Sequence, residues 1–566
     1  MLRRVAVVAI FAGVAGAWYI ALPPRATALL TMSSAPAPPL RGAIHVHSQR
    51  SDGTGDVEAI AAAAARAGLS FVVLTDHGDG TREPESPRYL EGVLTIDAVE
   101  ISTEQGHVVA LGLPETPYPL GGEARDVVED ISRLGGFALA AHPGSEKPEL
   151  QWTDWDVALG GLEWLNADSE WRDEPVWSLA RALLTYPMRS TETLVSMLDR
   201  PTATMDRWDT LTERRRVVAV AGADAHARIG FRSIGEPYAN GSSLHLPSYE
   251  RMFSVFSNAL PDTTFSGDAA ADAQAVLAAI RSGHVYSTID GLGGPAAMSF
   301  TATSGTASAV AGDVLPVGGP VTLRVDVQAP ATARIDLMKD GALLQSAAGA
   351  VLEQIVDAGA AVYRVEIMLP GNPGEPPVPW VVSNPIYVGR DQADAVPSDT
   401  RPRASRFAIQ YEDGPATGWT IETSPASLGV LAAVPAVDGT QLSLRYALGG
   451  TMASSPFTAL VMPAGPELAA HDRLTFTAWA DHPMRLSVQL REPEGDAGER
   501  WHRSVFLDST PREVTVYFAD MMPRGPVSRL RPALANADSI LFVIDTVNTP
   551  LGGNGTLWMD DVRYAR

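Results

Sequence analysis

The chain contains no cysteine among its 566 residues. It therefore has no disulfide framework, no lipid-modified cysteine near its N-terminus and no thiolate ligand for a metal ion. Stability must come from packed cores, and any metal site must use nitrogen and oxygen ligands. A chain of this length predicts three or so domains, because one domain usually spans about 100–200 residues.

Basic residues are also scarce. The 43 lysines and arginines are outnumbered by 66 aspartates and glutamates, which gives a formal net charge of −23. This balance argues against a broad nucleic-acid-binding surface, because such a surface needs clustered lysine and arginine to displace counterions from phosphates. An anionic substrate would have to be attracted by a local positive feature, and bound metal would be one.

The N-terminus combines the basic start MLRR with an uncharged apolar run over residues 5–22. This pattern predicts export, with the protein in the periplasm or at the cell surface. Two fates fit residues 1–30: a signal peptide with the small-residue cleavage site Ala26-Thr27-Ala28, or a membrane anchor, since the run is near the lower limit for a span. A Pro-rich linker over residues 31–40 follows.

Alternating strands and helices predict a barrel-like α/β domain over residues 41–290. Apolar strands such as AIHVH, FVVLTDH, FALAAHP and VVAVAGADAH alternate with helical stretches such as VEAIAAAAARAG. This alternation is typical of βα units around a largely parallel sheet or barrel. Beyond it, period-two patterns between Gly, Pro and Asp turns predict two all-β domains: an Ig-like sandwich over residues 291–392 and a jelly-roll sandwich over residues 404–566.

Histidines and carboxylates occupy the ends or starts of the predicted strands in the first domain. In AIHVHS two histidines lie two residues apart, so on a strand both imidazoles point to the same face. The ends of several strands converge on one mouth in a parallel barrel, which predicts a shared metal site. The candidate ligands are His45, His47, Asp52, His77, Glu100, His107, His142, Asp224 and His226.

Nine nitrogen and oxygen donors exceed what one ion needs, so two or three divalent ions are predicted, with zinc, manganese and iron as candidates. Asp76, beside His77, fits a role in orienting that histidine from outside the ligand set. Arg228 and Arg232 follow the last ligands and are candidates either to contact an anionic oxygen or to lie at the surface. Five tryptophans over residues 152–177 indicate a small helical core or a lid.

The order HxH, SDG, TDH, a strand glutamate, a histidine, AHP and DAH resembles the polymerase and histidinol phosphatase (PHP) metallohydrolases over roughly residues 41–290. The resemblance implies a distorted seven-stranded β/α barrel that binds two or three metal ions through the nine candidates. His107 stands at the position where the branches of that family differ in residue and spacing. A PHP domain followed by a β-sandwich ending in SNPIYV resembles the carbaryl-hydrolase-like branch. The ending LWMDDVRY is similar to galactose-binding jelly rolls, a kind of module that often binds carbohydrate.

Together these patterns predict a hydrolase of small-molecule phosphoesters, of the phosphatase or nucleotide phosphodiesterase type, that uses a metal-bound hydroxide. His142 or His226 would protonate the leaving group, and Arg228 or Arg232 would neutralise a phosphoryl oxygen. Two alternatives stay open. One is a carbamate or carboxylic ester hydrolase, which a pocket poor in lysine and arginine around residues 144–216 would favour. The other is a cell-surface carbohydrate-binding protein with an inactive barrel.

Overall fold

The computed structural model describes residues 16, 18–19, 22–26, 38–230, 243–244, 246–316, 318–390, 401–437, 439–493 and 498–566. The predicted N-terminal segment and the Pro-rich linker lie mostly outside these residues. Within the described ranges, no helix combines the length and the apolar character needed to cross a membrane. The chain divides into two compact units. Unit 1 is Met1–Pro114 with Glu123–Val396, and unit 2 is Glu115–Gly122 with Pro397–Arg566.

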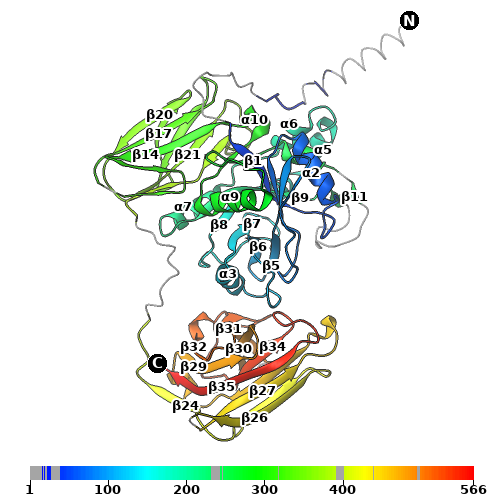
Figure 1. Ribbon diagram of the computed structural model, residues 1–566, viewed down its shortest axis with the longest axis vertical. Helices are drawn as coiled ribbons and strands as arrows, with labels where there is room; N and C mark the ends of the chain where they lie inside the picture. Colours follow the sequence, from blue (N-terminus) through cyan, green and yellow to red (C-terminus); the bar gives the residue numbers. More distant parts are fainter. Residues whose placement is uncertain are drawn as a thin grey trace. The chain divides into compact units, whose positions relative to one another are not determined.

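A closed barrel of strands forms the centre of unit 1 (Figure 1). Neighbouring strands around the ring pair in parallel, except that β5–β6 and β6–β7 are antiparallel. The remaining neighbours in the ring are β4 and β5. They follow one another in the chain with only Ala98 between them, so they are joined by the chain itself. The strands are β1 (Leu40–Val46), β2 (Phe71–Leu74), β4 (Val93–Asp97), β5 (Val99–Thr103), β6 (Gly106–Leu111), β7 (Phe137–Ala141), β8 (Gly161–Asn166) and β9 (Val218–Ala225).

Helices flank this ring, and some of them begin where a side chain caps the first turn. In α9 (Ala269–Ser282) the Asp268 side chain accepts a hydrogen bond at the N-terminus, and Gly283 ends the helix in the left-handed conformation at φ 78°. Val276 of α9 joins the apolar core of the ring strands. The other helices around the ring are α2 (Val57–Arg66), α3 (Ala124–Arg133) and α8 (Tyr249–Phe253).

A helical insertion separates β8 from β9, in the stretch where the tryptophans cluster. Trp152, Trp164 and Trp208 are buried, as a small apolar core requires, whereas Trp177 is 69% exposed. The insertion consists of α4 (Ala167–Arg172), α5 (Val176–Thr185), α6 (Ser190–Val195) and α7 (Thr202–Thr212).

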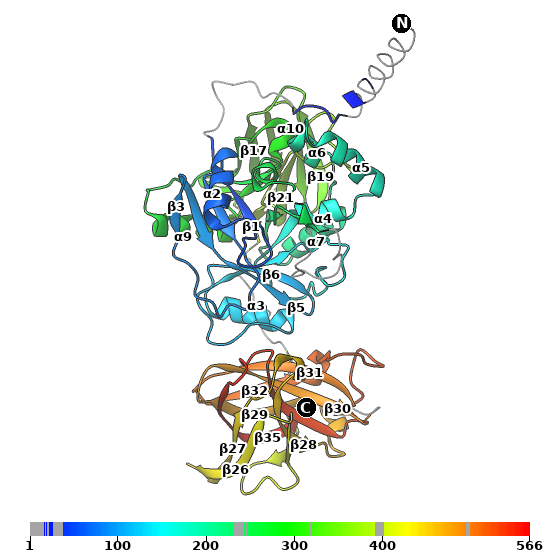
Figure 2. The ribbon, with the colours of Figure 1, turned by 90° about the vertical axis from the view of Figure 1, so that its right-hand side faces the viewer.

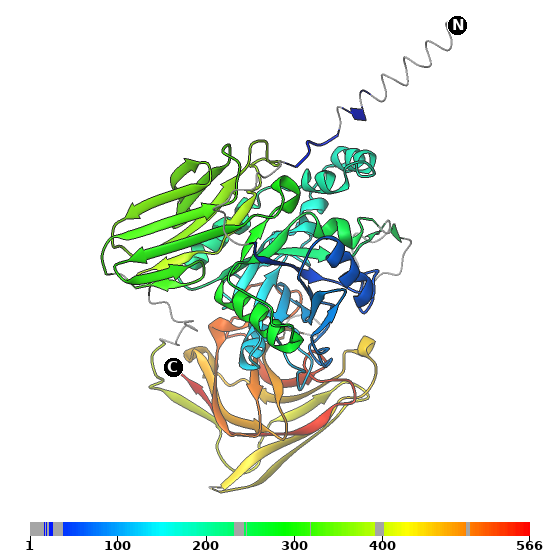
Figure 3. The same ribbon diagram turned by 45° about the horizontal axis from the view of Figure 1, so that its top comes forward.

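A β-sandwich continues unit 1 after the barrel, as the alternating pattern beyond residue 291 predicts (Figure 3). One layer is the antiparallel sheet β15-β14-β17-β20, and in the other β18 pairs with β19 and β21, which pairs with β22 and β23. Their bounds are β14 (Met298–Ser304), β15 (Ala307–Val310), β17 (Val321–Val327), β18 (Arg334–Lys339), β19 (Ala342–Ala348), β20 (Val351–Val356), β21 (Ala361–Met368), β22 (Val381–Ser383) and β23 (Ile386–Val388).

Hydrogen bonds cross the boundary expected between residues 290 and 291. Strand β22 of the sandwich pairs with β13 (Tyr286–Thr288), which pairs with β12 (Ser257–Leu260), and β12 pairs with β1 of the ring. The short β16 (Val314–Leu315) also pairs with β23. The barrel and the first sandwich therefore share one continuous hydrogen-bonded sheet and form a single compact unit.

Unit 2 is a β-sandwich of two six-stranded antiparallel sheets, which agrees with the all-β prediction for residues 404–566. Phe476, Trp501 and Phe542 are fully buried in its core. One sheet contains β24 (Phe407–Tyr411), β26 (Leu428–Ala436), β27 (Gly439–Ala447), β29 (Arg473–Ala480), β32 (Arg512–Tyr517) and β35 (Asn554–Ala565). The other contains β25 (Thr420–Thr423), β28 (Phe457–Pro463), β30 (Met484–Glu492), β31 (Glu499–Leu507), β33 (Met522–Pro523) and β34 (Ser539–Asp545).

Candidate metal centre

Four overlapping groups of histidine, aspartate and glutamate side chains meet in the barrel. In each group the potential ligand atoms lie within 4.8 Å of one another. Among the described residues the groups contain all nine predicted ligands, so the structure brings the whole predicted set together. The groups are His47, Asp52, His77 and His226; His45, His47 and Asp224; His45, Glu100 and His142; and His77, Glu100 and His107.

Glu100 is the shared member at the centre of this cluster. It is 1% exposed, and burial favours its neutral form, but the surrounding imidazoles, His45 and His77 foremost, hold its pKa well below the usual range. One ionised carboxylate can therefore serve more than one cation. Its oxygens lie 2.8–3.3 Å from ring nitrogens of five histidines, namely His45, His47, His77, His107 and His142.

Three of the nine donors have left-handed backbone conformations: His45 at φ 68°, His142 at φ 32° and Asp224 at φ 44°. Such conformations cost non-glycine residues about 1–3 kcal/mol each and tend to occur at functional sites. The pairing register of β1 also shifts between Ala43 and Val46. The two histidines of AIHVHS thus converge on Glu100 through an irregular strand end, and not through the regular alternation that the sequence pattern assumes.

Protein acceptors occupy one ring nitrogen of several histidines. His45 Nδ1 lies 2.6 Å from Glu163 Oε1, and His142 Nδ1 lies 3.0 Å from the carbonyl oxygen of Leu150. With its proton on Nδ1, each ring keeps Nε2 as a lone-pair donor facing the cluster. Metal-binding histidines are typically oriented in this way, so both rings fit a metal site.

Glu163 on β8 is a functional candidate that the sequence analysis did not select. It is 1% exposed, and besides its contact with His45 it accepts hydrogen bonds from the N–H of His142 at 2.7 Å and from Asn166 Nδ2 at 2.8 Å. A Cβ on Gly222 of β9 would lie only 2.1 Å from Glu163 Oε1, so glycine there leaves room for the carboxylate. The available signal is a lone carboxylate within the buried strand GLEWLN, whose other polar residue is the terminal Asn166.

The charge balance of the cluster favours bound cations. Asp52, Glu100 and Asp224 place three carboxylates in a site where each is at most 7% exposed, and Glu163 adds a fourth. Burial opposes a charge on His47, yet the carboxylates of Asp224 and Glu100 raise its pKa to about 10. Its Nε2 is buried and lies 3.2 Å from Glu100 Oε2 and 3.4 Å from Asp224 Oδ1, without a well-oriented hydrogen bond to either within the described residues. Uncompensated buried carboxylates are costly, so this donor set fits divalent metal ions.

Asp76 lies outside the four groups. Its carboxylate accepts hydrogen bonds from the N–H of Ser48 at 2.8 Å, from Ser48 Oγ at 2.7 Å and from Ser51 Oγ at 2.7 Å. Asp76 lies outside the ligand set, as predicted, but these hydrogen bonds fix the loop that leads to Asp52, whereas the sequence suggested that Asp76 orients His77.

A cavity of about 80 Å³ adjoins the cluster, and seven of the nine donors line it. Lys147 and Arg172 line it too, and Lys147 is one of only two lysines in the chain. Arg172 is ion-paired with Asp168, whereas the Lys147 ammonium has no ion pair within the part of the chain that the structure describes. The stretch 144–216 thus brings cationic side chains to the cavity. A pocket poor in lysine and arginine, which would favour a neutral carbamate or ester, is not what this lining forms.

The remaining predicted site residues differ in position. Arg228 lies 3.2 Å from Asp52 Oδ2, at the edge of the cluster. Arg232 lies outside the described residues. His226 has the most exposed side chain of the nine donors, at 16%, and its Nδ1 lies 2.9 Å from the carbonyl oxygen of Asp224.

Glu170 on α4 is a buried carboxylate near the cavity but outside the nine donors. Burial raises its pKa from 4.5 to about 8, although the N–H of Asp199 donates to it. Because the folded-state pKa is raised, ionisation is costlier in the native chain, and stability falls as the pH rises from 4.5 through about 8. Glu170→Gln should therefore stabilise unit 1 above that range by up to about 5 kcal/mol, at 1.36 kcal/mol per pKa unit.

Urea unfolding of this variant and the native chain at about pH 5 and about pH 9 measures the effect. Glu58→Gln, which changes an exposed carboxylate in the same unit, is the control. A stability difference that is the same at both pH values would contradict the assignment.

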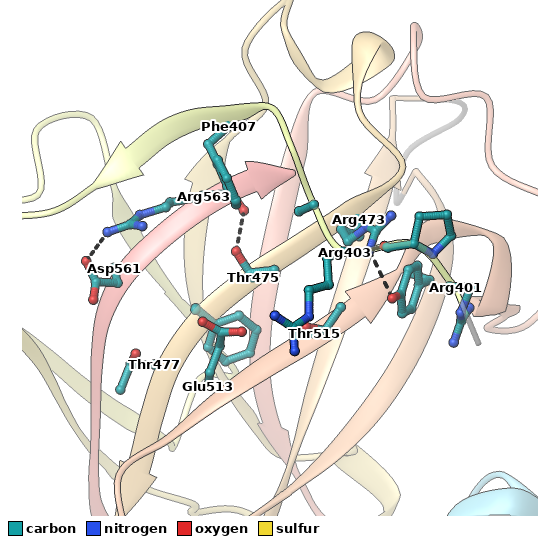
Figure 4. A pocket seen from close by; sticks show the side chains of 14 residues that line it. Arg401, Arg403, Phe407, Arg473, Thr475, Thr477, Glu513, Thr515, Asp561 and Arg563 are labelled. Carbon is teal, nitrogen blue, oxygen red and sulfur yellow. Dashed lines mark hydrogen bonds and ion pairs between the residues drawn. The ribbon is translucent and has the colours of Figure 1, made fainter. Parts of the chain in front are cut away.

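Unit 2 has a larger cavity, of about 400 Å³, on the outer side of β29, β32 and β35 (Figure 4). Arg473 donates to Tyr517 Oη at 3.0 Å, and its guanidinium lies 4.5 Å from the centre of that ring. Arg403 is exposed and belongs to the same lining. The other lining residues are Arg401, Pro402, Ala404, Phe407, Thr475, Phe476, Thr477, Glu513, Thr515, Asp561 and Arg563.

No family model matches the chain. An uncharacterized protein of Methanocaldococcus jannaschii, MJ1587, is 28% identical over 142 residues, which are 23% of this chain and 82% of that protein. Among solved structures, the family 11 carbohydrate-binding module of a Clostridium thermocellum cellulase is 15% identical, with a TM-score of 0.25 over 29% of this chain and 95% of the module. A family 30 module of the same organism is 10% identical, with a TM-score of 0.22 over 28% and 96%. Likenesses at this TM-score do not establish a shared ligand.

Proposed function

We propose that this chain is an exported, metal-dependent hydrolase of the PHP type that acts on small-molecule phosphoesters. The observation that carries the proposal is the clustering of nine nitrogen and oxygen donors, Glu100 among them, in four overlapping groups whose ligand atoms lie within 4.8 Å of one another. With β4 and β5 counted as one bent strand, the ring has the seven strands that the family resemblance implies. A scaffold with a purely structural role would have no use for so many buried histidines and carboxylates.

Two or three divalent ions, zinc, manganese or iron, held by these side chains would supply Lewis acidity and lower the pKa of water toward neutrality. The chain's own residues then divide the remaining tasks. Glu163 and the carbonyl oxygen of Leu150 orient His45 and His142. Lys147 places positive charge at the cavity where an anionic substrate would enter, and Arg172 stands there paired with Asp168.

His226 is the better of the two predicted proton donors. Both rings line the cavity and have contacts at both nitrogens, but the His226 side chain is 16% exposed and the His142 side chain only 4%. The carbonyl oxygen of Asp224 accepts from His226 Nδ1, and Nε2, which lies 3.1 Å from Asp52 Oδ2, is the atom that would either bind metal or carry the transferred proton. Of the two predicted arginines, Arg228 is the one that the structure describes, and it lies beside Asp52, from where it could contact an anionic oxygen.

Phosphoester substrates are favoured over neutral carbamates and carboxylic esters by the cations at the cavity. The chain has a net charge of −23 and two lysines, yet one of these lysines lines this cavity. A charge-assisted hydrogen bond from Lys147 would stabilise a phosphate by about 1.5–3 kcal/mol and would gain little from a neutral carbonyl group.

The substrate class is tested by replacing each lysine in turn. Lys147→Gln should raise KM for a phosphomonoester by about tenfold or more, because one charge-assisted contact is lost. The same change should leave hydrolysis of an aryl carbamate nearly unaffected. Lys339→Gln, on a strand of the sandwich, is the matched control and should leave the hydrolysis of both substrates unchanged.

The measurement combines elemental analysis of the purified protein with activity on a phosphomonoester, a phosphodiester and an aryl carbamate. If the chain binds two or more metals and is active only on the carbamate, the phosphoesterase proposal is wrong and the ester-hydrolase alternative takes its place. A folded chain that contains no metal and takes up none would contradict the hydrolase itself.

A second activity, carbohydrate binding, is favoured by the unit 2 cavity. Arginine, threonine and aromatic side chains line a hollow of about 400 Å³, a composition that suits a sugar with carboxylate or sulfate groups. We propose that this jelly-roll-type sandwich binds acidic carbohydrate. Under this proposal, carbohydrate binding by the sandwich accompanies the hydrolase activity of the barrel and is not an alternative to it.

Arg403→Gln should weaken binding of polygalacturonate about tenfold, since one guanidinium contact with a carboxylate is removed. Arg406→Gln, an exposed arginine outside the lining, serves as the control and should bind as the native chain does. Affinity gel electrophoresis with polygalacturonate, dextran sulfate and a neutral β-glucan measures the effect. Equal retardation of both variants, or no retardation of the native chain, would argue against a site in this cavity.

A further inference from the structure

Helix α5 has its polar and apolar sides reversed relative to an ordinary surface helix. Thr185 is its only buried residue, and Ser178 and Ala182 share that inward side. The large apolar side chains point outward instead. Their exposed fractions are 83% for Val176, 69% for Trp177, 62% for Leu183, 65% for Leu184 and, just beyond the helix, 59% for Met188. A contiguous apolar patch of this kind on a protein surface marks an interaction site.

Two arginines, Arg181 and Arg189, accompany the patch, and the carboxylates Asp173 and Glu174 directly precede the helix. An apolar stripe with arginines beside it is a composition found in helices that lie in the headgroup region of a bilayer. Arg181 and Arg189 would pair there with anionic headgroups.

Described residues of the N-terminal segment contact α5 and Arg189 just beyond it. Trp18 Nε1 donates to the carbonyl oxygen of Leu184 at 3.0 Å, and the Arg189 guanidinium donates to the carbonyl oxygen of Pro23. Trp18 is 37% exposed and Tyr19 is 70% exposed. Tryptophan and tyrosine concentrate at the membrane–water boundary, so these two aromatic residues and the exposed Trp177 suit a position in a bilayer interface.

We propose that α5 is a membrane-docking helix whose apolar face lies in the interface of a phospholipid bilayer. Figure 2 shows α5 at the edge of unit 1, on the side of the described N-terminal residues. Only residues 173–175 separate α5 from α4, which contributes Asp168 and Arg172 to the cavity. Three residues span at most about 11 Å, so docking holds this side of the cavity close to the bilayer. The proposal does not depend on the hydrolase activity.

The absence of cysteine gives a direct test, because one introduced cysteine provides a single labelling site. Leu183→Cys in the full-length chain is labelled with an environment-sensitive nitrobenzoxadiazole group. Ile355→Cys on β20 is the matched control, since the two side chains are 62% and 63% exposed. Met188→Cys provides a second position on the patch. Each labelled chain is reconstituted into phosphatidylcholine–phosphatidylglycerol vesicles.

We expect the labels at 183 and 188 to emit at shorter wavelength with vesicles and to be quenched about twofold or more by nitroxide headgroup lipids, while the label at 355 stays in water. Labels at 183 and 188 that remain water-exposed on the vesicle-bound chain would overturn the proposal. Shielding of these labels from water in the absence of vesicles would also overturn the proposal. If that shielding depends on protein concentration, a second copy of the chain covers the patch. If it does not, the chain's own N-terminal segment covers the patch.

Discussion

Glu100→Gln is expected to remove bound metal and hydrolytic activity together while the barrel remains folded. The glutamine is isosteric, but its single carbonyl oxygen cannot replace two anionic oxygens that face five imidazoles. Loss of a residue that only supports a ligand typically costs 10–100-fold in metal affinity or activity, so loss of this central carboxylate should cost more than about a hundredfold. Elemental analysis and kcat/KM on a phosphomonoester, measured on the same preparation, check both effects.

Glu149→Gln is the matched control for this prediction. Glu149 lines the same cavity but belongs to none of the four donor groups, so its replacement should leave metal content unchanged. A Glu100→Gln protein that keeps the full metal complement would show that the nine donors do not act as one centre. An unfolded variant would be recognised by circular dichroism, and Glu100→Asp, which keeps the charge, would then take its place.

The candidate ligands could be selected from the sequence because their signal is local. A histidine or carboxylate at the tip of an apolar strand, as in FVVLTDH or VVAVAGADAH, has no structural reason to be there, and strand tips in a barrel meet. All nine selected side chains lie in the cluster. The reason given for His45 and His47 was incomplete, however, because His45 has φ 68° and the strand is irregular at that point.

Other features could not be read from local patterns. Glu163 lies within a buried strand, and its role depends on the space that Gly222 leaves on the neighbouring strand. The contribution of Lys147 and Arg172 to the cavity depends on how a loop and α4 return to the barrel. The boundary at residue 291 followed a change in periodicity, whereas the sheet itself continues through β13 and β22, a pairing between strands about one hundred residues apart.

Glu163→Gln should weaken metal binding by about 10–100-fold without unfolding the chain, because Glu163 acts as a positioning residue. Its carboxylate accepts from His45 Nδ1, from the N–H of His142 and from Asn166 Nδ2, all within 2.8 Å. A glutamine has one acceptor oxygen for these three donors, so its amide N–H₂ would face at least one of them. The expected consequence is a His45 ring that is no longer held with its proton on Nδ1 and its Nε2 toward the cluster.

Metal dissociation constants, measured by competition with a chelator, separate this role from a structural one. Glu170→Gln is the control, since it also changes a buried glutamate of unit 1 but one outside the cluster, and it should leave metal affinity unchanged. A Glu163→Gln chain with native metal affinity would mean that packing alone orients His45. Glu163→Gln should also change the free energy of metal binding by more than it changes the free energy of unfolding of the metal-free chain. The reason is that the hydrogen bonds of Glu163 mainly set the ligand geometry.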